Sequence, residues 1–194
     1  MAEMRDILAS GKYSRVVDAT HPYAAEVTAN LSCVCKELRI PYTRLLRESA
    51  HISGETAPDM DTLINRLNEM SGIILSTLGC KSLEKLTQVR DFRERLWVRI
   101  LPSPETARFC ARLGYNPAHV IEAAPPFSTE QNITHIRRSD ASVLVTKESG
   151  KAGGYSEKCE AARLCHIPVL TLKRPEESGA SLSQIKILLK KEFA

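Results

Sequence analysis

The chain has 194 residues, of which 43% are hydrophobic and 26% charged, which is the composition of a globular protein with a real core. No apolar run reaches the roughly 20 residues needed to cross a bilayer, and residues 1–13 are too charged for a secretory signal, so we expect a cytoplasmic protein without membrane contact. The formal net charge of +4 allows an acidic ligand, but Lys and Arg are scattered along the chain, which argues against nucleic-acid binding.

Short β-branched or apolar runs alternate with stretches of helical period along the chain. This alternation is typical of βα units, in which helices cover both faces of a parallel sheet. Seven short strands are predicted, at residues 16–20, 42–46, 73–78, 97–101, 119–123, 143–146 and 169–172.

Helices are predicted from capping residues and from the spacing of apolar side chains. An amphipathic helix opens the chain and ends near Gly11, and Pro22 is placed for the first turn of a helix over residues 27–38. Residues 59–70 form a third helical pattern.

Two further helices follow predicted strands. Ser103 and Gly114 mark the start and the end of one, and Ser128 to Gln131 is a capping-box pattern that opens the other.

The predicted fold is α/β, with two Rossmann-like lobes that contain parallel sheets. We place the lobes at residues 1–71 and 72–194. The chain opens with a helix rather than with a strand and a Gly-rich turn, so we expect the first lobe to be incomplete. A homo-oligomer through that lobe is then expected, because an incomplete sheet leaves an unpaired edge. Residues 16–47 resemble residues 143–174, either as two similar halves or through the general likeness of βαβ units.

The six cysteines show neither a disulfide framework nor metal-ligand spacing, so we interpret them as reduced and predict no metal site.

Three loops that follow strands are candidate sites, because ligands of open α/β sheets bind beyond the carboxyl ends of the strands. Residues 18–24 form a polar turn that contains His21, an imidazole able to donate or accept a proton near neutral pH. The alternative role for His21 is a helix cap. Residues 76–81 and 146–154 combine glycines with hydroxyl or lysine side chains, which suits an anion, although a Gly-rich connection explains the latter equally well.

At these loops the sequence resembles the precorrin-6A and cobalt-precorrin-6A reductases of cobalamin biosynthesis. The runs that carry the resemblance, in the family's order, are VVDATHPYA at 16–24, IPYTRLLRE at 40–48, LSTLG at 75–79, WVRILPSPE at 97–105, PPFS at 125–128, VLVTKESG at 143–150 and AARLCHIPVLTLKRP at 161–175.

The resemblance implies an oxidoreductase with two Rossmann-like domains that face a cleft holding NADPH or NADH and a corrin-type polycarboxylate macrocycle. The implied reaction is the reduction of one ring double bond of (cobalt-)precorrin-6A to give (cobalt-)precorrin-6B. His21 is the implied catalytic residue. The residues implied to bind substrate or cofactor are Thr20, Tyr23, Arg44, Arg47, Thr77, Gly79, Lys147, Ser149, Gly150 and Lys151. For the four cations among them, solvated surface charge is the alternative.

Two departures from the family pattern matter. Members usually open with a strand and a Gly-Gly-Thr type turn that holds the cofactor phosphates, and no counterpart precedes Met1, so we expect this chain alone to bind cofactor weakly. Lys151 follows Gly150, where the family usually has a second glycine.

Two other functions stay open at this point. A methyltransferase of the same pathway would also pair two α/β lobes around a tetrapyrrole, but it needs a glycine-rich S-adenosylmethionine site that the sequence does not reveal. A non-catalytic tetrapyrrole-binding protein is the other candidate.

Overall fold

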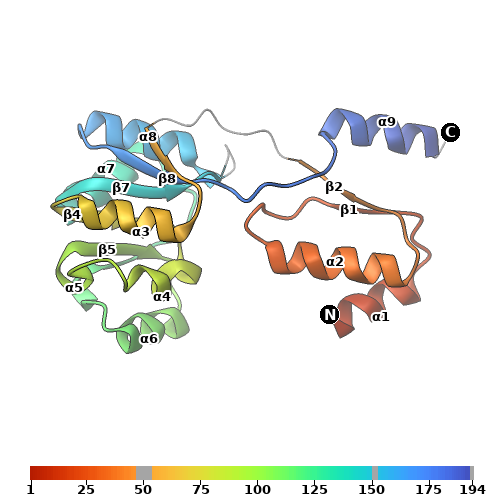
Figure 1. Cartoon of the computed structure of the whole chain (residues 1–194), viewed down its shortest axis with the longest axis horizontal. Helices are drawn as coiled ribbons and strands as arrows, with labels where there is room; N and C mark the ends of the chain where they lie inside the picture. The colour runs from red at the N-terminus through yellow and green to blue at the C-terminus, as the bar shows by residue number, and fades with distance from the viewer. Residues whose placement is uncertain (47–53, 150–152, 193–194) are drawn as a thin grey trace. The chain divides into compact units, whose positions relative to one another are not determined.

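The computed structural model describes residues 1–46, 54–149 and 153–192 of the chain. It consists of two compact units (Figure 1). The first unit contains Met1–Glu48 and Pro175–Ala194, and the second contains Ser49–Arg174.

The first unit is built on two parallel strands, with Val16 opposite Tyr42 and Asp18 opposite Arg44. Helix α1 packs against α2, and α2 packs against both strands. The elements are α1 (Ala2–Ser10), β1 (Val16–Asp18), α2 (Ala25–Glu37), β2 (Tyr42–Arg44) and α9 (Leu182–Glu192).

The second unit contains a six-stranded sheet in the order β3-β8-β7-β4-β5-β6, with every pair parallel. Its strands are β3 (Glu55–Ala57), β4 (Ile73–Ser76), β5 (Leu96–Ile100), β6 (Val120–Glu122), β7 (Ala141–Lys147) and β8 (Val169–Leu172). Its helices are α3 (Met60–Glu69), η1 (Cys80–Ser82), α4 (Leu83–Leu86), α5 (Phe92–Arg95), α6 (Pro104–Leu113), η2 (Pro117–His119), α7 (Thr129–Ser139) and α8 (Tyr155–Leu164).

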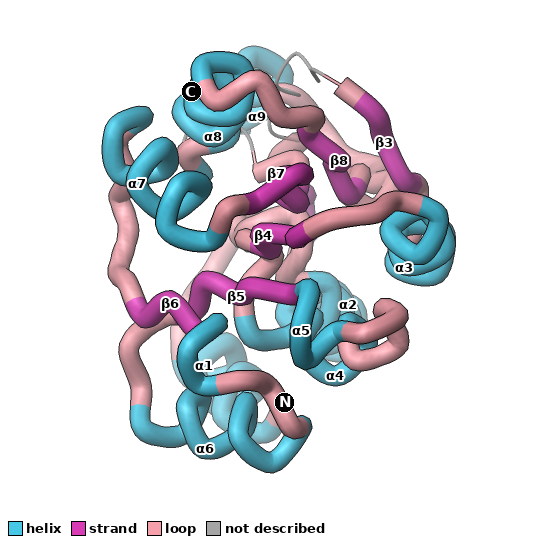
Figure 2. The backbone as a smooth tube through the Cα atoms, turned by 90° about the vertical axis from the view of Figure 1, so that its left-hand side faces the viewer, coloured by secondary structure: helices cyan, strands magenta, loops and turns pink. Residues whose placement is uncertain are grey.

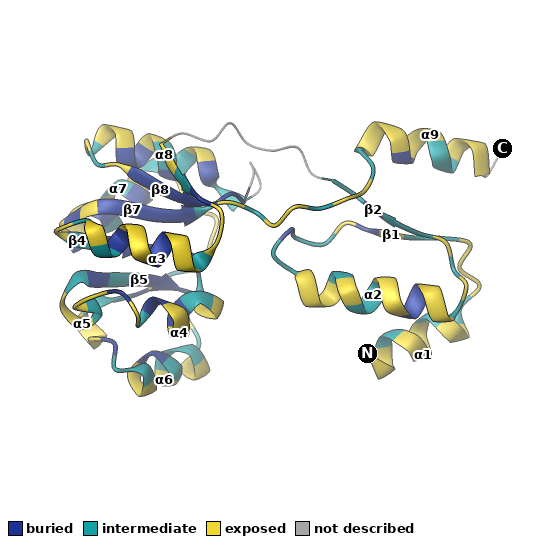
Figure 3. Cartoon of the chain, in the orientation of Figure 1, coloured by how far each residue is buried: buried dark blue, intermediate teal, exposed yellow. Residues whose placement is uncertain are grey.

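Helices cover both faces of this sheet. Figure 2 shows α7 and α8 on one face and α3, α4 and α5 on the other. Buried residues concentrate on the central strands β4, β7 and β8 (Figure 3), as the near-continuous apolar runs of these strands require. The α/β class with two parallel sheets is therefore confirmed.

All seven predicted strands are present, and β3 is an eighth that the sequence pattern did not indicate. The predicted caps are also confirmed. Ser103 caps α6 and Gly114 ends it in the left-handed conformation, while Ser128 and Gln131 form the capping box of α7. Pro22 lies outside α2, which begins at Ala25, because a turn closed by the Ala24 N–H on the His21 carbonyl precedes the helix.

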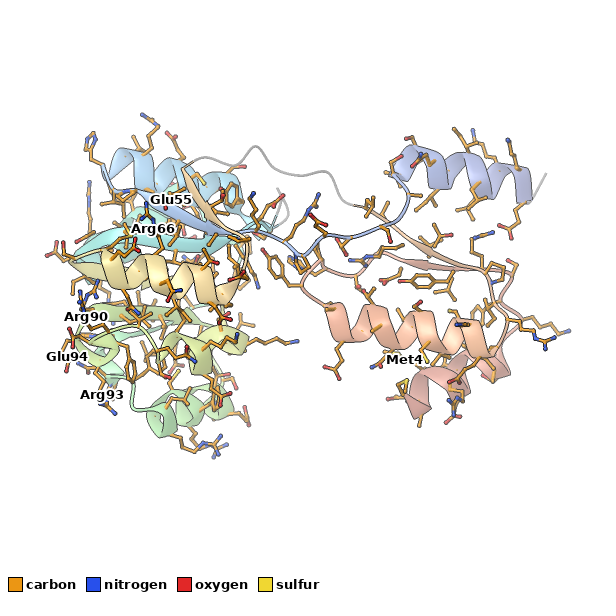
Figure 4. All side chains as sticks on the ribbon, in the orientation of Figure 1. Met4, Glu55, Arg66, Arg90, Arg93 and Glu94 are labelled. Atoms are coloured by element: carbon orange, nitrogen blue, oxygen red, sulfur yellow. The ribbon has the colours of Figure 1, made fainter. Side chains whose placement is uncertain are left out.

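The division into units differs from the predicted boundary after residue 71. Strand β3 pairs with β8, and Glu55 of β3 forms an ion pair with Arg66 of α3 (Figure 4), so residues 55–69 belong to the second sheet. At the other end of the chain, Ala180 pairs with Leu45, which places the last residues in the first unit. Both pairings join segments more than a hundred residues apart, and local sequence patterns do not reveal them.

Candidate functional site

The loop after β1 carries the predicted catalytic residue. His21 Nδ1 accepts a hydrogen bond from the Tyr23 backbone N–H at 3.3 Å, and the two rings are tilted with centroids 5.6 Å apart. Because Nδ1 is an acceptor, the neutral ring carries its proton on Nε2. His21 and Tyr23 are both half-buried. The loop therefore fixes the tautomer of His21 as well as its position.

A buried polar network lies beneath this loop. The Asp18 carboxylate accepts hydrogen bonds from the Thr20 backbone N–H at 2.9 Å, the Tyr42 hydroxyl at 2.8 Å and Arg44 Nη1 at 2.8 Å. Arg44 Nη1 also donates to Thr20 Oγ1 at 2.9 Å, and Nη2 donates to Glu177 Oε1 at 2.6 Å. These bonds hold the two strands, the Thr20 turn and the C-terminal segment together.

The network changes the acidity of its members. Burial alone raises the pKa of Asp18, but the hydrogen bonds from Thr20, Tyr42 and Thr28 together outweigh burial and lower this pKa to about 2. Burial and the hydrogen bond to Asp18 raise the pKa of the Tyr42 hydroxyl. Asp18 is therefore ionised and Tyr42 neutral throughout the physiological pH range.

Arg44 was predicted to hold a substrate carboxylate at the rim of the site. Its side chain is only 4% exposed, and two carboxylates of the protein already match its charge. Arg44 therefore organises the Thr20 turn from inside the unit. Arg47, the second predicted cation of this region, lies outside the described residues.

The loop after β4 contains Thr77 and Gly79. The Thr77 hydroxyl donates to the Val145 carbonyl at 3.0 Å, so it ties the loop to β7. Gly79 has φ 86°, and no atom lies within 4 Å of the position of a Cβ there. Backbone in this conformation with open space beside it lets a ligand approach closely.

The loop after β7 contains Lys147 and Ser149. Burial lowers the pKa of Lys147, Lys81 lowers it further, and Cys80 has the opposite effect. Ser149 Oγ donates to the Gly153 carbonyl at 3.2 Å, and the buried Glu148 lies 3.6 Å from Arg174 Nε. Gly150 and Lys151 lie outside the described residues.

Sequence reasoning selected Thr20 and Arg44 but missed Asp18, Tyr42 and Glu177. Asp18 stands in the quoted DATHPYA block, and a carboxylate at the end of an apolar strand was the signal that could have identified it. Glu177 gave no local signal, since 133 residues separate it from Arg44.

The described residues contain neither a metal-binding cluster nor a membrane-spanning helix. No group of three or more His, Cys, Asp or Glu side chains there is arranged to hold a metal ion. None of the helices within those residues has the length and apolarity needed to span a membrane.

Comparisons with known proteins agree on one family. Residues 1–191 match the family model described as precorrin-6x reductase CbiJ/CobK. The chain is 34% identical over 182 residues to the cobalt-precorrin-6A reductase of Methanothermobacter thermautotrophicus, covering 89% of this chain and 58% of that protein. It is 31% identical over 181 residues to the cobalt-precorrin-6A reductase of Priestia megaterium, covering 90% and 70%.

A solved structure described as CobK precorrin-6A reductase is also similar, with a TM-score of 0.74 and 23% identity, covering all of this chain and 79% of that chain. At this identity the likeness concerns the fold alone.

Proposed function

The chain belongs to the precorrin-6x reductase CbiJ/CobK family, and on that premise we propose that it takes part in the NAD(P)H-dependent reduction of precorrin-6A or cobalt-precorrin-6A. The observation that carries this proposal is the family match over residues 1–191, which includes both units. The chain spans 58% of the length of the Methanothermobacter relative. The activity of the whole enzyme is therefore proposed for this chain and does not follow from family membership alone.

When bound, NADPH or NADH would supply the hydride for the reduction of one carbon–carbon double bond of the macrocycle. The turn at Gly79 is suited to a negatively charged group of cofactor or substrate, because its backbone is open. Lys81 follows two residues later and lies close enough to Lys147 for its charge to lower the pKa of that lysine. Ser149, on the loop after β7, and Gly150, which lies outside the described residues, are also proposed to bind cofactor or substrate.

His21 is proposed to donate or accept the proton that accompanies hydride transfer. The acceptor role of Nδ1 leaves Nε2–H as the donor of the neutral ring, and the adjacent Thr20 and Tyr23 position the turn that carries it. The Asp18 network acts through this turn, so its members are positioning residues.

The reductase is favoured over the other two functions that the sequence left open. The two sequence relatives reported above are both named cobalt-precorrin-6A reductases, and neither name describes a methyltransferase or a carrier.

The test is to add NADPH or NADH to the protein and its macrocycle and to follow the absorption of the ring. A reductase consumes the cofactor and changes the spectrum, because conjugation is lost when the double bond is reduced. Binding of the macrocycle with an unchanged spectrum, at saturating concentrations of both cofactors, would support the carrier instead. His21→Asn serves as the comparison variant.

A further inference from the structure

One face of the second sheet changes from apolar to polar toward the carboxyl ends of its strands. Leu75, Trp97, Leu144 and Val169 lie side by side in register and pack in a single core cluster. Side chains two positions further along a strand return to the same face. Those positions are occupied by Thr77, Arg99, Thr146 and Thr171. A polar row therefore lies on the face covered by α7 and α8.

Arg99 occupies this row with its charge almost buried, at 6% exposure. Its Nη1 donates to Asn132 Oδ1 at 2.8 Å and lies 3.1 Å from His135 Nδ1, and its guanidinium carbon lies 3.8 Å from the centroid of the Phe127 ring. Since arginine only donates, His135 Nδ1 is the acceptor. Of the three guanidinium nitrogens of Arg99, only Nη1 has hydrogen-bond partners among the described residues.

Lys158 of α8 is a second cation, also 6% exposed. Its Nζ donates to the Gly153 carbonyl at 2.9 Å, which also accepts from Ser149 Oγ. Burial, together with the positive charges of Arg99 and Lys147, lowers the pKa of Lys158 to about 8. Glu157 acts in the opposite direction and more weakly.

The protein balances the charge of this cluster only in part. Over the described part of the chain, neither Arg99 nor Lys158 forms a hydrogen bond or an ion pair with a carboxylate. The Glu157 carboxylate, whose Oε2 is buried without a hydrogen-bond partner, offsets the charge of Lys158 only weakly. A buried charge is costly unless an opposite charge accompanies it. The Thr146 hydroxyl in the same row is also fully buried without a hydrogen-bond partner. Unused donors and an excess of positive charge at the carboxyl edge of a parallel sheet are what an oxyanion requires.

We propose that Arg99 and Lys158, with the Thr146 hydroxyl from the same polar row as Arg99, form an anion subsite that binds a carboxylate or phosphate group. The existence of the subsite follows from the cluster itself. Only the choice of ligands rests on the proposed function, in which the macrocycle offers carboxylates and the cofactor offers phosphates.

Titration of the full chain with inorganic phosphate and with citrate tests the subsite, with the unfolding temperature measured against sodium chloride at equal ionic strength. Both anions should raise the unfolding temperature of the wild type, and Lys158→Met should weaken their apparent affinity about tenfold or more. Arg99→Met should do the same. Lys85→Met is the matched control, because Lys85 is an exposed lysine of the same unit, paired with Asp61.

Two results would overturn the proposal. One is anion binding by both methionine variants within twofold of the wild type, and the other is a wild type that responds to these anions no more than to chloride. Lys158→Met without anion should be at least as stable as the wild type, since an unbalanced buried charge is removed. A clear loss of stability would instead assign the ammonium to the fold.

Titrations with uroporphyrin, NADPH and NADH identify the source of the anion. If Lys158→Met weakens the binding of uroporphyrin but of neither nucleotide, the subsite is assigned to a macrocycle carboxylate. Weaker binding of NADPH but not NADH assigns it to the 2′-phosphate, and equal weakening of both assigns it to the pyrophosphate. These assays require no turnover, so the subsite stands or fails independently of the reductase activity.

Discussion

Arg44 Nη1 lies 2.8 Å from Asp18 Oδ1, and neither side chain is more than 4% exposed. This pair joins β2 to β1 in the interior of the first unit. Removing one partner of a buried pair leaves the other charge unmatched. We therefore expect Asp18→Ala to destabilise the first unit by about 3–5 kcal/mol.

The measurement uses two probes. Trp97, the one tryptophan of the chain, lies in the second unit and reports its unfolding by fluorescence. Hydrogen exchange at the β1 and β2 amides reports the first unit. Asp18→Ala should accelerate hydrogen exchange at the β1 and β2 amides. The unfolding transition reported by Trp97 fluorescence should stay unchanged. Glu37→Gln, which breaks the exposed pair with Arg5, should cost at most about 1 kcal/mol.

The same carboxylate predicts an acid-dependent stability. The pKa of Asp18 is about 2 in the folded chain and about 3.9 in an unfolded one. A lowered pKa stabilises the fold above the unfolded value, and this contribution is lost as the pH falls from about 4 to 2. We expect a loss on the order of 2 kcal/mol over that window. The stability difference between wild type and Asp18→Asn should narrow in parallel, and a constant difference would refute the role of Asp18.

His21→Asn separates the chemistry of His21 from its structural role. An asparagine side chain accepts a backbone N–H two residues ahead, as His21 Nδ1 does from Tyr23, so the turn is kept while the imidazole is lost. Turnover should fall by at least a hundredfold, in line with the usual size of general acid–base catalysis, about 10²–10⁴-fold. Unfolding free energy should change by less than about 1 kcal/mol. An unchanged turnover with intact stability would assign His21 a capping role.

The lowered pKa of Lys158 predicts that the stability of the second unit depends on pH in the alkaline range. Its pKa is about 8 in the folded chain and about 10.4 when unfolded, so below pH 8 the buried charge destabilises the second unit. Lys158→Met should therefore be more stable than the wild type at pH 7, and the difference should shrink as the pH rises from 8 to 10. Comparing the two proteins at each pH cancels the titration of the cysteines and tyrosines that they share. Trp97 fluorescence during urea unfolding measures this difference.

Gly54 and Gly79 give a matched pair of backbone tests. Both have positive φ, 85° and 86°, which side chains adopt only at a cost of about 1–3 kcal/mol. A Cβ at Gly54 would also lie 2.6 Å from the Val169 carbonyl oxygen, whereas a Cβ at Gly79 meets nothing within 4 Å. Gly54→Ala should therefore be the more destabilising substitution in a urea titration. The reverse order would contradict the positions of these turns.

The sequence predicted the elements of the fold better than their assembly. Long apolar runs such as Val143 to Thr146 identify central strands, and Ser103, Gly114 and Ser128 identify helix ends, because these signals are local. Strand β3 escaped notice because its three residues, Glu-Thr-Ala, form no apolar run. Its partner β8 lies more than a hundred residues away, and no local pattern contains that information.

The site was predictable to a similar degree. The loops after β1, β4 and β7 were identified because strand ends and glycines are visible in the sequence. Arg44, Arg99 and Lys158 could not be assigned in the same way, since a buried cation and a solvated one look alike until the neighbouring residues are known.

The first unit consists of two separated stretches of chain, so its second stretch is synthesised only after the whole second unit. Arg44 and Asp18 emerge from the ribosome early, but Glu177 and Ala180 follow only after the whole second unit has been made. Until then the buried arginine has one of its two carboxylate partners. The second unit is one uninterrupted stretch, so it can fold before the final segment of the first unit has been synthesised. We therefore expect the second unit to fold before the first, which is the reverse of the common order during translation.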